Sequence, residues 1–129
     1  MRMAPSLSDN PSPSIRCSPP RIIQGGMGVA VSSWPLAREV SQAGQLGVVS
    51  GTALDVVIAR RLQDCDVDGH VRRALGQFPD PAMADRVLRR YYRPGGRDPG
   101  QPYTPVPRLR LNPAAAALEL SVVANFVEV

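Results

Sequence analysis

The sequence contains no lysine. All fifteen of its basic residues are arginines, and with eleven acidic residues they give a net charge of +4. A basic surface is typical of nucleic-acid-binding proteins when the charges cluster, but these arginines run from Arg2 to Arg110 and many alternate with acids. The densest group, Arg86–Arg93 with Tyr91 and Tyr92, is interpreted as a solvated helix face with Tyr91 packed inward. We therefore expect no nucleic-acid partner.

Cysteine is scarce, and long apolar runs are missing. Cys17 and Cys65 are the two cysteines, they form no CxxC motif, and no secretory signal precedes them, so we expect a reduced, cytoplasmic setting. Cys65 lies between Asp64 and Asp66, whose carboxylates disfavour a thiolate, so it is a poor candidate nucleophile. No run of eighteen apolar residues occurs, and we expect no membrane partner.

The length of 129 residues allows one ordinary domain. Residues 1–20 are rich in serine and proline and are predicted to be a disordered leader. Residues 21–63 alternate between strand and helix patterns, which indicates an α/β fold with parallel strands, either doubly wound or a closed barrel. Residues 64–111 are predicted to be a helical and Pro/Gly-rich insertion, and residues 112–129 a helix that looks truncated, because it ends without a cap.

The expected elements follow from apolar periodicity and capping residues. We predict strands over 21–24 and 46–50, the second buried on both faces, and helices over 34–43, 53–63, 71–78 and 81–92. Ser32 or Ser33 is expected to cap the first helix, Thr52 with Asp55 the second, and Asp80 the helix that begins at Pro81. The predicted inward faces are those of Leu36, Val40 and Ala43 in the first helix, and of Leu118, Val122, Val123, Phe126 and Val129 in the last.

A glycine turn, Gly25–Gly28, follows the first predicted strand. Glycines at such a place let a flat or anionic ligand approach the backbone, whose amide groups can then donate hydrogen bonds to it. The turn lacks the spacing of a dinucleotide-binding motif and the lysine of a phosphate-binding loop. Taken alone, it is equally compatible with a tight turn that binds nothing.

The run IIQGGMGVAVSSWPLAREVSQAGQLGVVSGT, residues 22–52, closely resembles the opening of the nitronate monooxygenase family, which also includes flavin-dependent enoyl reductases. The resemblance implies the N-terminal part of an FMN-binding (β/α)8 TIM barrel, and the region from Cys65 to Val129 resembles a helical and proline-rich insertion of longer family members. It also implies that Gly26, Met27 and Gly28 lie against the flavin ring. The cofactor-binding residues expected on this basis are Gly25, Gly26, Met27, Gly28, Gly51 and Thr52.

The implied activity is oxidation of a nitronate, a small-molecule substrate, with FMN and dioxygen; in the enoyl-reductase branch the substrate is an enoyl thioester. A complete barrel needs roughly 200 residues or more, and His70 does not match the family's catalytic histidine, so no catalytic residue is assigned. His70 is expected to be a surface or locally hydrogen-bonded imidazole. The alternative is a catalytically incomplete piece that acts by association, including association with itself.

Two further features have simple interpretations. Asp64–Gly69 reproduces the start of an EF-hand calcium loop, but the twelfth position is Leu75 instead of glutamate and Arg72 falls at the ninth. We therefore expect a polar turn and no metal. Trp34 follows the glycine turn and either lines a substrate mouth or, more commonly for such a residue, packs over the first helix.

Overall fold

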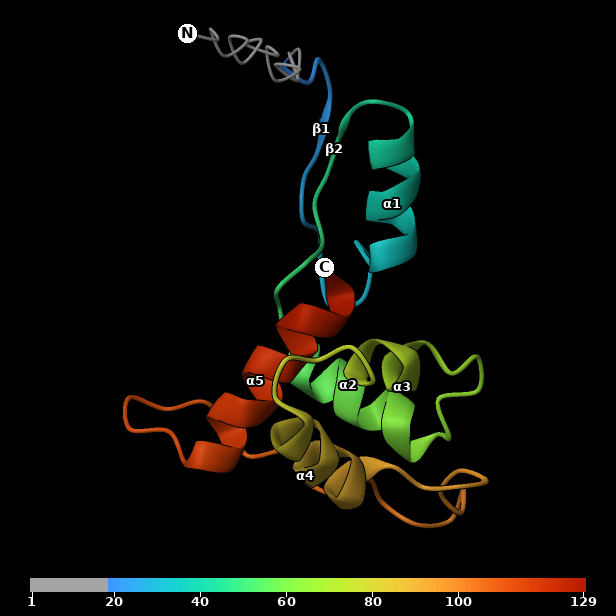
Figure 1. The fold of residues 1–129 in the computed structure, drawn as a ribbon, viewed down its shortest axis with the longest axis vertical. Coiled ribbons are helices and arrows are strands. Elements are labelled where there is room, and N and C mark those ends of the chain that lie inside the picture. The colour runs from blue at the N-terminus through green and yellow to red at the C-terminus, as the bar shows by residue number, and fades with distance from the viewer. Residues whose placement is uncertain (1–18) are drawn as a thin grey trace, which may run out of the picture.

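A computed structural model describes residues 19–129, so the predicted leader lies almost wholly outside the described residues. Figure 1 shows an arm, which holds the strands and the first helix, and a cluster formed by the remaining helices, with the C-terminal end of the last helix at their junction. In chain order the elements are β1 (Ile23–Gln24), α1 (Trp34–Gln42), β2 (Leu46–Gly47), α2 (Leu54–Gln63), α3 (His70–Leu75), α4 (Pro81–Tyr91) and α5 (Ala115–Glu128).

The arm is a β-α-β unit with parallel strands, as its sequence predicts. Ile23 pairs with Leu46 and Gln24 with Gly47. Helix α1 crosses very close to β2: a Cβ atom added to Gly47 would lie 2.0 Å from the carbonyl oxygen of Ala37. Only glycine allows this approach, because the atom that it would meet belongs to the backbone.

The predicted inward face of α1 is wrong. Ala37 is its buried residue, whereas Leu36 and Ala43 are exposed and Val40 is half-buried. The backbone contact at Gly47 sets the helix rotation, and it brings Ala37 to the sheet instead of the larger side chains. Full burial of the second strand is also wrong, since the described sheet has two strands and leaves Leu46 exposed.

The helical cluster encloses the main apolar core. Leu54, Ile58 and Leu62 of α2 pack with residues of α3, α4 and α5, and the exposed fractions of Ile58 and Leu62 are 0%. Asp80 caps α4 as predicted, because its Oδ1 accepts a hydrogen bond of 3.0 Å from the Met83 N–H. The Thr52 and Asp55 cap of α2 does not form: the residue before the helix is Ala53, which has a left-handed backbone with φ of +53°.

Helix α5 buries a different face from the one predicted. Its buried residues are Ala117, Leu120, Val123, Ala124 and Glu128. Of the predicted stripe only Val123 is buried; Leu118, Val122, Phe126 and Val129 are exposed. Because α5 is apolar on nearly every side, periodicity alone cannot tell which side meets the other helices.

The segment between α4 and α5 is irregular, as its proline and glycine content predicts, and Gln63 fixes it to α2. The side-chain Oε1 of Gln63 accepts a hydrogen bond from the Thr104 N–H at 2.6 Å, and the backbone carbonyl of Gln63 accepts one from the Arg97 N–H at 2.8 Å. Gln63 is only 2% exposed, so these bonds satisfy a side-chain oxygen and a backbone oxygen that burial alone would penalise. Over the described residues, no helix combines the length and apolar character needed to cross a membrane.

Candidate functional site

The glycine turn after β1 is held by the hydroxyl group of Ser32. Ser32 Oγ accepts hydrogen bonds from the Met27 N–H at 3.0 Å and from Gln24 Nε2 at 2.9 Å, and it donates to the Gly25 carbonyl at 3.2 Å. Ser32 is 1% exposed. It is therefore an anchor for the turn and not the helix cap; Ser33 occupies the cap position of α1 and makes no side-chain capping bond.

The same turn lies against the residues that follow β2. The Ser50 N–H donates to the Ser32 carbonyl at 2.8 Å, and a Cβ atom on Gly26 would lie 3.6 Å from Ser50 Cα. The C-terminal ends of the two parallel strands thus meet at one edge, which we call the glycine edge: residues 25–28 and 50–52. The six residues predicted to bind the cofactor, Gly25, Gly26, Met27, Gly28, Gly51 and Thr52, all lie on this edge.

The glycine edge is open and uncharged. All six predicted residues are exposed, and Met27 retains 49% of its accessible surface. The N–H groups of Gly26 and Gly28 donate no hydrogen bond to another described residue. Added Cβ atoms at Gly25 and Gly51 would meet nothing within 4 Å. No acid, base or thiol lies within the edge, so redox chemistry there would have to come from a bound group.

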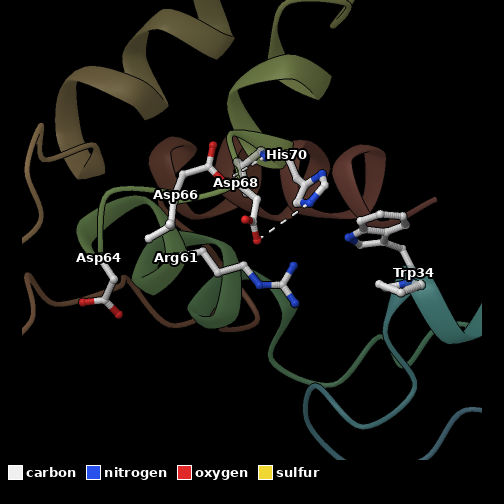
Figure 2. Close-up of a pocket in the computed structure, with 9 residues that line it drawn as sticks. Trp34, Arg61, Asp64, Asp66, Asp68 and His70 are labelled. Carbon is white, nitrogen blue, oxygen red and sulfur yellow. Dashed lines mark hydrogen bonds and ion pairs between the residues drawn. The ribbon is translucent and has the colours of Figure 1, made fainter.

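A cavity of about 370 Å³ lies at the junction between the arm and the helical cluster. Trp34 and Pro35 at the start of α1 form one wall, and Arg61 with the turn from Asp64 to Val71 forms the other. In Figure 2 the Arg61 guanidinium and the His70 ring point toward Trp34, whereas Asp64 points away from it. We call this space the junction cavity.

Glu128 connects the two walls of the junction cavity by hydrogen bonds to a residue of each wall. Its Oε1 accepts a hydrogen bond from Arg61 Nη1, and its Oε2 accepts one of 3.2 Å from the Trp34 N–H, the first residue of α1. The Glu128 side chain is 1% exposed, while that of Arg61 retains 34%. The carboxylate therefore balances the arginine and also satisfies an unpaired N–H at a helix N-terminus.

His70 and Trp34 meet across the junction cavity. Their rings are in edge contact, with centroids 5.0 Å apart. His70 Nδ1 is 2.7 Å from Arg73 Nη2, and because an arginine can only donate, Nδ1 acts as the acceptor and leaves the proton on Nε2. His70 is exposed and locally hydrogen-bonded, as its sequence context predicts.

Two of the three aspartates of the calcium-like motif accept hydrogen bonds within the protein. Asp66 accepts hydrogen bonds from the N–H groups of Val71 and Arg72 in the first turn of α3, at 3.2 and 2.9 Å, and Asp64 Oδ2 accepts from the Tyr103 hydroxyl at 2.7 Å. Asp68 extends into solvent with 78% of its side chain exposed. No group of three or more potential metal ligands comes together within residues 19–129.

The groups with displaced pKa values lie outside the glycine edge and the junction cavity. The hydrogen bond from Arg86 lowers the pKa of Glu119 and the same contact raises the pKa of Arg86, which joins α4 to α5. Burial raises the pKa of Tyr91, whose hydroxyl is buried without a hydrogen-bond partner among the described residues. These shifts reflect packing of the helical cluster and identify no acid–base catalyst.

Sequence reasoning finds the glycine edge but misses the residues that hold it. Ser32 and Gln24 lack any local pattern that separates them from a helix cap and a strand residue, and the role of Glu128 depends on a contact with Trp34 across 94 positions.

Comparison of the chain with protein-family models, with curated proteins and with solved structures finds no match.

Proposed function

We propose that the arm is the cofactor-contacting part of a flavin-dependent oxidoreductase of the nitronate monooxygenase type, built on an FMN-binding (β/α)8 barrel. The observation that supports this is the glycine edge. A parallel β-α-β unit presents its glycine turn beside the residues that follow the second strand, and ligands of α/β proteins bind beyond the carboxyl ends of parallel strands.

The residues of the glycine edge fit one wall of a flavin site. Gly26 and Gly28 offer N–H groups to the polar rim of a flat ring, and the exposed Met27 thioether can pack on its face. Side chains that would block the ring are missing at Gly25 and Gly51. Bound FMN would supply the electron-accepting chemistry toward a nitronate or, in the enoyl-reductase branch, the hydride for an enoyl thioester.

Titration of FMN with the purified chain tests this proposal. We expect saturable quenching of flavin fluorescence by the wild type, and a dissociation constant about tenfold higher for Gly26→Val. The branched side chain would occupy the approach to the ring and crowd the Val49 carbonyl oxygen, which lies 3.4 Å from the added Cβ. Gly100→Val is the matched control: Gly100 is exposed in the irregular segment, and its added Cβ would meet only Asp98 Oδ1, at 3.5 Å.

Equal quenching by the wild type, Gly26→Val and Gly100→Val would show that the glycine edge does not hold the flavin. The proposal would also fail if no quenching reached saturation. A second readout is the visible absorption band of the flavin, which a specific site shifts and a weak surface contact does not.

The alternative function is association of the chain with itself. It is favoured by the exposed apolar residues of α5, above all Leu118, Val122 and Phe126, and by the exposed strand residues of the arm. Sedimentation equilibrium tests it directly. A concentration-dependent dimer that Val122→Glu converts to a monomer would support association, whereas a monomeric wild type would refute it.

A further inference from the structure

The junction cavity is separate from the glycine edge and includes none of its six predicted residues. Its volume of about 370 Å³ lies in the range of small-molecule sites, which often form where two parts of a protein meet. Trp34, Pro35, Val67 and Val71 supply apolar surface, and charged groups stand among them. This combination is suited to a small ligand with one apolar part and more than one polar group.

Hydrogen-bond donors remain free on both walls of the junction cavity. Arg61 donates to Glu128 through Nη1, and its Nε and Nη2 groups have no other partner among the described residues. The indole N–H of Trp34 likewise donates to no described residue. Because Arg61 is already balanced by Glu128, these donors attract a carboxylate through directed hydrogen bonds more than through net charge.

One acceptor remains free on the wall that carries Arg61. Asp64 and Asp66 are paired with Arg97 and Arg72, respectively. Asp68 has no such partner: the His70 Nε2 atom lies 3.9 Å from its carboxylate, and Arg73 donates to its backbone carbonyl and not to its carboxylate. Its carboxylate is therefore the uncompensated negative charge at the cavity, where it favours an ammonium group.

We propose that the junction cavity binds a small zwitterion of the α-amino acid type with an apolar side chain. The ligand carboxylate would face Arg61 and the Trp34 indole N–H, and the ligand ammonium would face Asp68. The apolar side chain would contact Trp34 and Val71. His70 is a positioning residue in this arrangement, since its edge contact holds the Trp34 ring while Arg73 fixes the imidazole.

Tryptophan fluorescence provides the test, because Trp34 is the only tryptophan of the chain and lines the cavity. The probes are L-leucine, N-acetyl-L-leucine, which lacks the ammonium, and L-leucinamide, which lacks the carboxylate. We expect a saturable change with L-leucine and dissociation constants about tenfold higher for both blocked compounds, since each loses one charged hydrogen-bonding group.

Asp68→Asn separates this proposal from general binding to the surface. The variant should bind L-leucine about as weakly as the wild type binds N-acetyl-L-leucine, while its affinity for N-acetyl-L-leucine should not fall. Asp85→Asn is the matched control, because Asp85 is an exposed aspartate of α4 outside the cavity. Unchanged thermal midpoints in both variants would show that the fold is retained.

Three results would overturn the proposal. The first is the lack of a saturable change with L-leucine. The second is equal affinity for L-leucine and either blocked compound, which would indicate a site for a cation or an anion alone. The third is an Asp68→Asn variant that still discriminates L-leucine from N-acetyl-L-leucine as the wild type does. The titration contains no flavin, so failure here leaves the proposed oxidoreductase function untouched.

Discussion

Replacement of Gly47 by alanine tests the packing of the arm. The added Cβ would lie 2.0 Å from the Ala37 carbonyl oxygen and 2.6 Å from both the carbonyl carbon and Cα of Ala37. Non-bonded carbon contacts are about 3.5–4.0 Å, so α1 would have to move away from β2 by more than about 1 Å. Overpacking of this kind costs about 1–3 kcal/mol, and we expect the upper end because backbone atoms cannot rotate aside.

Gly51→Ala is the matched control for this substitution. Its added Cβ would meet nothing within 4 Å, and alanine restricts the unfolded chain, so its effect should be neutral or stabilising by up to about 1 kcal/mol. The assay is urea denaturation, followed by circular dichroism for the helices and by Trp34 fluorescence for the start of α1. The packing argument is refuted if Gly47→Ala unfolds at the same urea concentration as Gly51→Ala.

Three other substitutions test polar contacts of the core and the junction. Tyr91→Phe removes the buried hydroxyl that has no described partner, so thermal unfolding should show equal stability or a gain of up to about 1 kcal/mol. Burial raises the pKa of Tyr91 above 10.0; folding stability is therefore full below that pH and falls as pH rises further, and Tyr91→Phe should lack this alkaline loss. The hydrogen bond from Arg86 lowers the pKa of Glu119 below 4.5, so the contribution of this carboxylate to folding stability is present above pH 4.5 and is lost on acidification. Glu119→Gln should therefore lose less stability than the wild type in an acid titration, and parallel stability curves would contradict this. Glu128→Gln leaves Arg61 without its charge partner and should lower folding stability by about 2 kcal/mol. This loss is smaller than that for a fully buried pair, because Arg61 is partly exposed. A red shift of the fluorescence of the neighbouring Trp34 is the local readout.

Local chemistry explains which parts of the fold the sequence predicts well. Helix α1 begins where a serine precedes a tryptophan and Pro35, and the chain turns after it at Gly44, whose φ is +73°. Asp80 caps α4 for similar reasons. Each of these features is decided by a few neighbouring residues, so a single sequence contains the needed information.

Features that depend on distant contacts are poorly predicted. The rotation of α1 is set by Gly47, ten positions beyond Ala37, and the buried face of α5 is set by helices that precede it by dozens of residues. Thr52 and Asp55 satisfy a capping pattern, yet Ala53 adopts a left-handed backbone and the pattern fails. In each case tertiary packing overrides a local preference that is worth only about 1 kcal/mol.

The short stretch from Ser32 to Trp34 connects the two candidate sites physically. Ser32 holds the glycine turn through its hydroxyl, and two residues later the Trp34 N–H is held by Glu128. Because both ends of this stretch are fixed by buried oxygens, a displacement of Trp34 at the junction cavity must either be absorbed within three residues or move the glycine turn. Glu128 therefore helps to fix the glycine turn relative to the helical cluster, through Trp34 and Ser32.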